Sequence, residues 1–253
     1  MKDRIAVAAC AGLMALLLAG CGTVQQAMRC DPPELTGFLP DHRLLVRQPP
    51  SFPFHYLWQA RGIDWRRYSG IYVAPVNTNY LLRDRLWKQA SRDDPQSTRQ
   101  DLATLGNYMR DSFVQELRKV ESRGGFKVVN RPRPRTLTLE LAVTWLRPTE
   151  AELNYAGTAA NLLVPGVSLV TRLMATGTVS MEARLVDSRT RQLLFMVADR
   201  EKDPAAVIPL PAYTWYGATE YNMGHWAQQL AAMSVSARFA DIEHDAPIHL
   251  IAY

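Results

Sequence analysis

The stretch Thr136–Leu146, TLTLELAVTWL, alternates apolar side chains with smaller or polar ones along its whole length. In an extended strand, successive side chains point to opposite faces of the sheet. One predicted face therefore holds Leu137, Leu139, Leu141, Val143 and Trp145, and the other holds Thr136, Thr138, Glu140, Ala142 and Thr144. This stretch predicts a long strand with an apolar face that needs a covering layer.

A helix that can cover this face is predicted just before the strand, from about Arg99 to Val120. Thr98, with Asp101 three residues later, resembles a capping pair, and Gly124-Gly125 is typical of a helix end. Apolar side chains recur every three or four residues and form one stripe: Leu102, Leu105, Met109, Phe113, Leu117 and Val120.

Two shorter strands flank this helix, at Ile71–Val76 and Phe126–Val129. A strand, helix and strand joined by short connections predict a crossover with parallel strands. Downstream, 178–186 and 192–199 alternate as a hairpin around the turn Asp187–Thr190. A second helix is predicted over Glu220–Phe239, with its apolar face formed by Met223, Trp226, Leu230 and Met233.

The fold class that follows is α/β, because amphipathic helices beside alternating strands bury their stripes against a sheet. The expected arrangement is a mixed sheet of about five strands with helices packed on it. The order is β-α-β-β, an apolar helical segment, then β-β-α, in a single domain.

The apolar segment is Leu153–Thr171, which carries no charge. Its length raises the question of a transmembrane helix, but Pro165-Gly166 would break a helix near its middle. Two short helical pieces, 156–164 and 167–174, are expected instead. They either cover the sheet or leave a partly exposed docking or self-association patch, made of Leu162, Leu163, Val164 and Leu169.

The N-terminus has a charged start, Met1–Arg4, and an apolar run, Ile5–Leu18. A short basic region followed by an apolar core is typical of a secretory signal. The ending Leu18-Ala19-Gly20-Cys21 resembles the lipobox of bacterial lipoproteins. That resemblance implies cleavage between Gly20 and Cys21 and acylation of Cys21. In such lipoproteins an Asp directly after the cysteine marks retention in the inner membrane. Because Gly22 stands at that position here, the resemblance implies an outer-membrane location, with the domain facing the periplasm.

These features divide the chain into a removed signal at 1–20, a lipidated flexible tether at 21–35 and a single domain at 36–253. Of the 29 basic and 24 acidic residues, removal of the signal takes away Lys2, Arg4 and Asp3, so 27 and 23 remain, an excess of +4. So mild an excess does not indicate a nucleic-acid partner. Cys30 is the one thiol left after processing and is either inert or forms an intermolecular bridge.

No catalytic signature is found, so the expectation is that the protein is not an enzyme and has no cofactor or metal. The histidines, His42, His55, His225, His244 and His249, lack metal-ligand spacing. His225 is expected to be half-buried, and Glu140 and Glu182 to face outward from the sheet. The aromatics Trp58, Trp65, Trp215, Tyr216 and Trp226 leave open an alternative, a carrier of a small apolar or glycan ligand. An envelope hydrolase is the third and weakest interpretation.

Five stretches together resemble the bacterial lipoproteins grouped as domain of unknown function 3313. They are GFLPDHRLL at Gly37–Leu45, IDWRRYSGIYVAPV at Ile63–Val76, LGNYMRDSFVQEL at Leu105–Leu117, FKVVNRPRP at Phe126–Pro134 and GTVSMEARLVDSRTRQLL at Gly177–Leu194. The resemblance implies a lipoprotein without a settled activity or agreed site residues. The expected partners are the bilayer, through acylated Cys21, and other envelope or transport components or a second copy.

Overall fold

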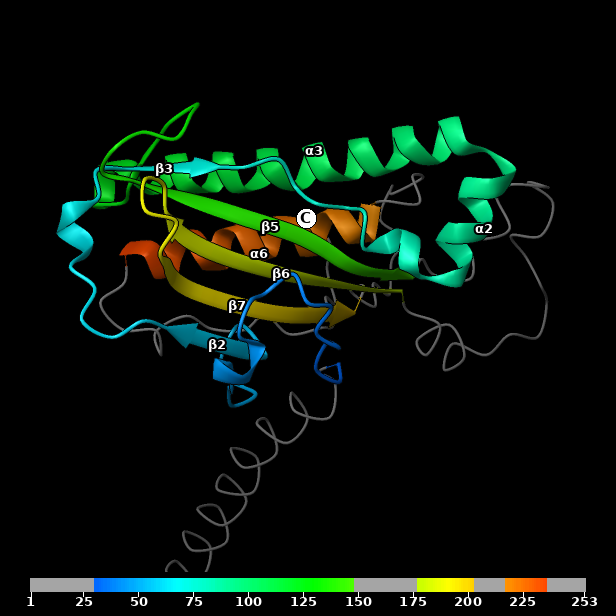
Figure 1. Cartoon of the computed structure of the whole chain (residues 1–253), viewed down its shortest axis with the longest axis horizontal. Coiled ribbons are helices and arrows are strands. Elements are labelled where there is room, and N and C mark those ends of the chain that lie inside the picture. The colour runs from blue at the N-terminus through cyan, green and yellow to red at the C-terminus, as the bar shows by residue number, and fades with distance from the viewer. Residues whose placement is uncertain (1–29, 148–176, 203–216, 236–253) are drawn as a thin grey trace, which may run out of the picture.

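A computed structural model describes residues 30–147, 177–202 and 217–235 (Figure 1). Within these residues a seven-stranded mixed sheet has the order β1-β2-β7-β6-β5-β3-β4. The strands are β1 (Val46–Arg47), β2 (Tyr56–Gln59), β3 (Gly70–Val73), β4 (Lys127–Val128), β5 (Thr136–Arg147), β6 (Thr178–Asp187) and β7 (Leu193–Lys202). The mixed α/β class and single domain are confirmed, but two more strands are present than the sequence predicts.

The centre of the sheet is the antiparallel set β5, β6 and β7, whose long registers run nearly the length of each strand. On one side, β3 is parallel to both β4 and β5, which confirms the predicted parallel crossover. Gly70 is required at the start of β3, because a Cβ there would lie 2.8 Å from the Lys127 carbonyl oxygen. On the other side, β2 and β1 extend the sheet antiparallel from β7.

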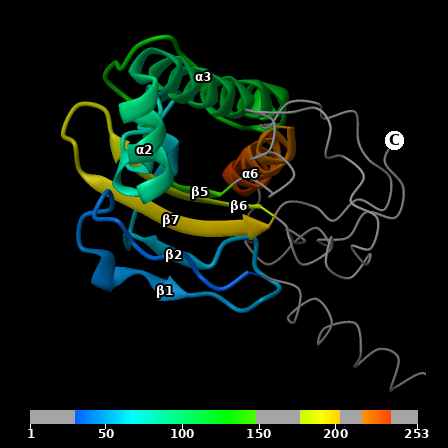
Figure 2. The same cartoon turned by 90° about the vertical axis from the view of Figure 1, so that its right-hand side faces the viewer.

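Three described α-helices pack on the sheet: α2 (Arg85–Asp93), α3 (Pro95–Val120) and α6 (Gly217–Val235). Figure 2 shows α2, α3 and α6 on one side of the sheet. The predicted capping pair of Thr98 and Asp101 is wrong, because α3 begins earlier, at Pro95. The Asp94 side chain accepts the Ser97 backbone N–H at 2.9 Å, and Thr98 is buried inside the first turns.

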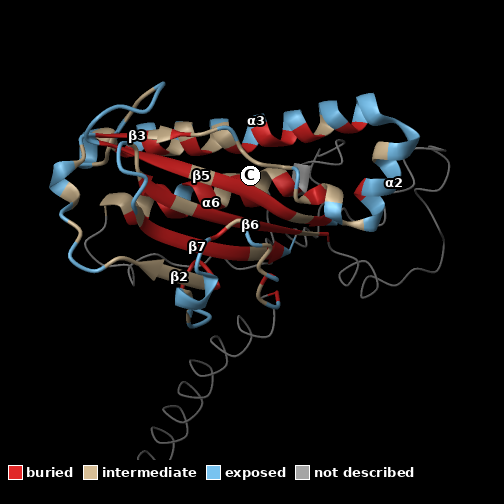
Figure 3. Cartoon of the chain, in the orientation of Figure 1, coloured by how far each residue is buried: buried red, intermediate tan, exposed pale blue. Residues whose placement is uncertain are grey.

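The core lies between the helices and the apolar face of β5, as the alternation predicts. Leu139, Leu141, Phe113 and Leu117 are each no more than 1% exposed. Figure 3 shows the buried residues as a continuous layer along β5, β6 and β7 and the facing side of α3. The predicted α6 residues Met223, Trp226, Leu230 and Met233 also join this cluster.

Trp145 does not lie on the face that the alternation predicts. A β-bulge between Val143 and Trp145 shifts the register by one residue, so Leu146 continues the core face. Trp145 instead pairs with Ser180, on the same face as Glu140 and Ala142. The prediction is wrong because a period of two assumes an unbroken pleat.

The N-terminal segment covers part of this second face. Leu39 is buried with Met196 and Ala198 of β7, and Leu35, Phe38, Tyr56 and Trp58 pack around them. Phe52 and Phe54, which precede β2, are buried in the main core and fix this segment to the domain. Four 3₁₀ turns are described: η1 (His42–Leu44), η2 (Trp65–Arg67), η3 (Leu81–Arg83) and η4 (Glu121–Arg123).

In the described part of the chain, every helix is too short or too polar to cross a membrane. The signal and lipidation residues Gly20 and Cys21 lie outside the described residues. So do the apolar segment Leu153–Thr171 and its predicted patch, Leu162, Leu163, Val164 and Leu169. These expectations stay predictions.

Candidate functional site

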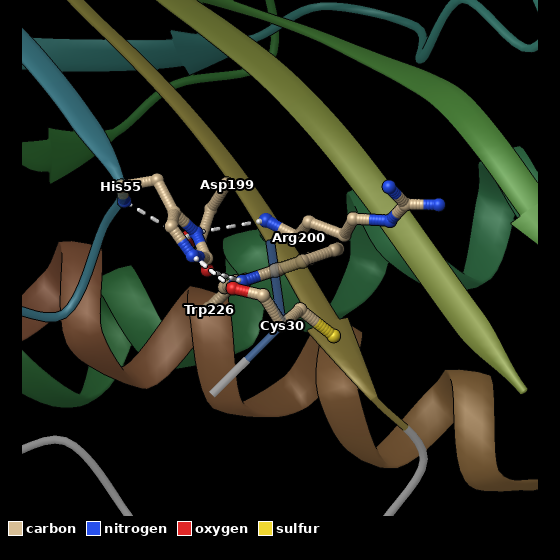
Figure 4. Close-up of polar contacts among 5 residues, drawn as sticks. All are labelled: Cys30, His55, Asp199, Arg200 and Trp226. Carbon is tan, nitrogen blue, oxygen red and sulfur yellow. Dashed lines mark hydrogen bonds and ion pairs between the residues drawn. The ribbon is translucent and has the colours of Figure 1, made fainter. Parts of the chain in front are cut away.

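A buried polar cluster joins the first described residue to the sheet and to α6. We call Cys30, His55, Asp199 and Trp226 the polar latch (Figure 4). His55 immediately precedes β2, Asp199 lies on β7, and Trp226 lies on α6. His55 and Asp199 are 4% and 0% exposed, and Trp226 is fully buried.

The Asp199 carboxylate is the centre of this cluster. Its Oδ1 accepts the His55 backbone N–H at 2.9 Å and lies 2.5 Å from His55 Nδ1. Its Oδ2 accepts the Trp226 indole N–H at 2.8 Å. His55 Nε2 lies 2.9 Å from the Cys30 carbonyl oxygen. The latch thus links the N-terminal segment, two strands and a helix.

Each polar position of this pair has a hydrogen-bond partner. A carbonyl oxygen can only accept, so His55 Nε2 donates to Cys30. His55 Nδ1 lies beside both Asp199 Oδ1 and the Arg200 backbone N–H, which is 3.4 Å away. A buried polar pair of this kind is costly to break, because removing one partner leaves the other buried without it.

The Cys30 thiol lies beside this pair but does not form a reactive dyad with it. Burial raises its pKa to about 12; the charges of Lys202 and Arg200 oppose this rise, and those of Glu201 and Asp199 add to it. A thiol with so high a pKa carries almost no thiolate at neutral pH and is a poor nucleophile. The geometry supports the inert alternative for Cys30. It also places Cys30 on the domain, within the range 21–35 that the sequence assigns to a flexible tether.

A second buried carboxylate, Glu182 on β6, fixes the next part of the N-terminal segment. Its oxygens accept Thr36 N–H at 2.6 Å, Thr36 Oγ1–H at 2.8 Å and Leu39 N–H at 3.2 Å. Glu182 points to the face that the sequence indicates, away from the main core. It is nevertheless 0% exposed, because the N-terminal segment covers it there.

Glu140 does not face Glu182 across the strands. In the register it lies opposite Arg184, whose Nε donates to Glu140 Oε2 at 2.6 Å, and Arg191 forms a second ion pair with it. Burial alone would raise the Glu140 pKa, but hydrogen bonds from Arg191 and Arg184 outweigh burial and hold it below its ordinary value. The two carboxylates therefore do not form an acid–base pair.

The other candidate residues do not converge on one site. His42 is exposed, and half-buried His225 stacks on Tyr221 as a packing residue, which confirms its prediction. Among the described residues, no three or more His, Cys, Asp or Glu side chains are grouped to hold a metal. Trp58 packs on the second face, whereas Trp65 and Trp226 belong to the main core. Trp215, Tyr216, His244 and His249 lie outside the described residues.

Sequence reasoning missed the partners of the polar latch. His55 and Asp199 are 144 residues apart, and neither stands in a motif that would connect them. The only local signal is the placement of polar residues among apolar neighbours, His55 after Phe54 and Asp199 after Val197-Ala198.

Comparisons with known proteins give one family and several distant structures. The family model described as "Protein of unknown function (DUF3313)" matches residues 34–230. Among curated proteins, none matches the chain significantly.

The solved structures that match are distant in sequence and in geometry. The PelC dodecamer from Paraburkholderia phytofirmans is 12% identical, covering 72% of this chain and 97% of that one, with a TM-score of 0.37. Lipoprotein GNA1162 from Neisseria meningitidis is 15% identical, covering 64% of this chain and 96% of that one, with a TM-score of 0.26. Because the family model spans most of the sequence, the chain belongs to the DUF3313 family of proteins of unknown function.

Proposed function

We propose that this protein is a non-catalytic lipoprotein, anchored in the outer membrane through acylated Cys21, whose periplasmic domain docks on other envelope components. The observation that carries this proposal is the polar latch. It fixes Cys30 to the domain nine positions after the lipobox cysteine. An acylated chain start followed so soon by a fixed point holds the domain close to the bilayer.

Chain geometry sets the reach of this attachment. Nine residue steps at about 3.4 Å each span at most roughly 31 Å. The tether that the sequence predicts, 21–35, would reach about 48 Å at the same spacing, so the latch shortens it. Two or more acyl chains would hold the protein stably, since each buried methylene contributes about 0.8 kcal/mol.

The chemistry of the latch supports a structural role for its histidine. A catalytic histidine needs a free nitrogen in reach of a substrate proton. His55 has Nδ1 on Asp199 and Nε2 on the Cys30 carbonyl, and it is almost fully buried. The adjacent thiol of Cys30 has a pKa of about 12 and cannot serve as its nucleophile.

The docking surface that we propose is the patch predicted from sequence, Leu162, Leu163, Val164 and Leu169. The test replaces Leu163 and Leu169 with Lys in the full chain and crosslinks intact cells, followed by identification of the captured proteins. A matched control replaces two exposed leucines, Leu44 and Leu86, each 44% exposed, with Lys. Docking predicts an unchanged melting temperature and loss of specific crosslinks in the patch variant, with the control unaffected.

Two results would contradict this docking proposal. Unfolding of the Leu163→Lys, Leu169→Lys variant would show that the patch belongs to the core. Absence of any specific partner for the unaltered protein would count against docking altogether.

A further inference from the structure

One corner of the second sheet face carries positive charges that form no ion pair with any described residue. Trp145 and Arg147 on β5 lie opposite Ser180 and Thr178 on β6. Ser180 and Thr178 lie in turn opposite Arg200 and Lys202 on β7. We call Trp145, Arg147, Arg200 and Lys202 the cationic corner. Directly opposed residues share a face, so all four side chains belong to the same surface.

The indole of Trp145 holds two of these cations together. The guanidinium carbon of Arg147 lies 5.1 Å from the ring centroid, and that of Arg200 lies 5.7 Å from it. The bulge after Val143 is what turns Trp145 to this face. Between the cations on β6 stand the small side chains of Thr178 and Ser180.

Carboxylates of the described residues form no ion pair with this corner. Among the ion pairs of residues 30–147, 177–202 and 217–235, none includes Arg147, Arg200 or Lys202. The neighbouring acids on β7, Asp199 and Glu201, are buried and alternate onto the opposite face. Arg147 and Lys202 are exposed.

Two donors in the corner also lack an acceptor among the described residues. The Trp145 indole nitrogen and Arg200 Nε are buried atoms with no hydrogen-bond partner there. An unsatisfied buried donor costs about 1–3 kcal/mol, so such groups usually meet an acceptor in the functional state. Guanidinium groups beside an indole suit phosphate oxygens, which accept several charge-assisted hydrogen bonds at once.

The position of the corner along the chain favours lipid headgroups as the source of phosphate. The backbone N–H of Arg200 lies 3.4 Å from His55 Nδ1, and His55 Nε2 lies 2.9 Å from the Cys30 carbonyl oxygen, so the β7 side of the corner begins close to the point where the described chain begins. If Cys21 is lipidated, as the proposed function requires, the headgroup layer is within about 31 Å of this point. Trp and Arg side chains are also favoured at a membrane–water interface.

We propose that the cationic corner binds the phosphates of anionic phospholipid headgroups and seats this end of the sheet on the bilayer. The anchor would hold the protein at the membrane, and the corner would set the orientation of the domain. The surface facing away from the bilayer would then be fixed for docking.

The experiment uses the processed lipoprotein, purified from membranes and reconstituted into vesicles of phosphatidylcholine with or without phosphatidylglycerol. An environment-sensitive fluorophore is attached through Thr178→Cys, since Thr178 faces the corner and Cys30 is buried. Headgroup-labelled lipid then quenches the fluorophore when the corner is seated. Quenching is expected on phosphatidylglycerol vesicles and is expected to be weak on pure phosphatidylcholine.

A double variant, Arg147→Gln with Lys202→Gln, removes the two exposed charges of the corner. Each cation near an anionic surface strengthens the binding equilibrium about fivefold. Loss of both should therefore lower the ratio of seated to free domain about 25-fold. The matched control is Arg131→Gln with Arg133→Gln, two exposed cations beyond the opposite end of β5, on the order of 35–40 Å away. This control should keep its quenching, and all variants should keep their melting temperature.

Equal quenching on both lipid compositions, or equal loss in the control, would overturn the proposal. Reversal by millimolar inorganic phosphate would show a small-anion site instead of a bilayer contact and would also overturn it. Flotation of the protein with pure phosphatidylcholine vesicles reports on the lipid anchor alone. A failed anchor and a failed corner therefore give different results.

Discussion

His55 Nδ1 lies 2.5 Å from Asp199 Oδ1 in the interior of the protein, across 144 residues of sequence. The other imidazole nitrogen holds the Cys30 carbonyl, and the other carboxylate oxygen holds the Trp226 indole. This one buried contact therefore connects the start of the domain to its last described helix. The N-terminal segment is part of the folded unit from Cys30 onward.

The Asp199→Asn substitution should destabilise the domain strongly. It keeps the size of the side chain but replaces one of the two acceptor oxygens with an N–H donor, so the buried contacts to His55 and Trp226 cannot all be kept. Breaking one side of a buried pair costs about 3–5 kcal/mol, so the free energy of unfolding should fall by that amount in urea denaturation.

The control for this substitution is Asp31→Asn, an exposed carboxylate in the same N-terminal segment. It should change the unfolding free energy by less than about 0.5 kcal/mol. Thiol labelling gives a second readout, because loss of the latch should expose Cys30 to a thiol reagent before global unfolding. Equal changes in the unfolding free energy for the two substitutions would show that the latch does not stabilise the domain.

Replacing Glu182 with Gln should destabilise the N-terminal segment over the sheet. The carboxylate accepts three hydrogen bonds, and an amide nitrogen placed toward Thr36 or Leu39 cannot accept them. A buried donor without a partner costs about 1–3 kcal/mol. Hydrogen exchange should locate the loss at Thr36 and Leu39. The exposed Glu34→Gln is the matched control, and a similar result for both would contradict the role of Glu182.

Stability in acid should depend on Glu140. Arg191 and Arg184 hold its folded pKa below the ordinary value of 4.5, so its stabilising contribution is complete above that pH. The contribution is lost as pH falls through the lowered folded pKa. The difference in unfolding free energy between the parent and Glu140→Gln should therefore shrink in acid. Arg191→Gln should move the loss of stability to higher pH. If the difference in unfolding free energy between the parent and Glu140→Gln stays constant with pH, the prediction is contradicted.

The regular elements could be predicted from the sequence because their signals are local. The stripe from Leu102 to Val120 gives α3, and the alternation in β5 and β6 gives the centre of the sheet. The short strands β1 and β2 were missed, since β2 has four residues, all of intermediate burial, and no periodic pattern.

The buried polar contacts could not be predicted in the same way. A strand pattern gives the face of Glu182 but not the segment that covers it, which lies 146 residues away along the chain. The bulge at Trp145 likewise leaves no mark in the alternation, and it decides which residues form the cationic corner. Such features depend on contacts between distant parts of the chain.

The most direct test of the central claim is the chemical state of Cys21. The full chain is produced in a Gram-negative host, recovered from its membranes, and its N-terminal peptide is measured by mass spectrometry. A lipid-anchored protein predicts a chain that begins at Cys21, carries a diacylglycerol thioether and an acylated amino group, and loses both the lipid and its outer-membrane location in Cys21→Ala. An unmodified Cys21 in the parent, or fatty acid still incorporated into Cys21→Ala, would contradict the account.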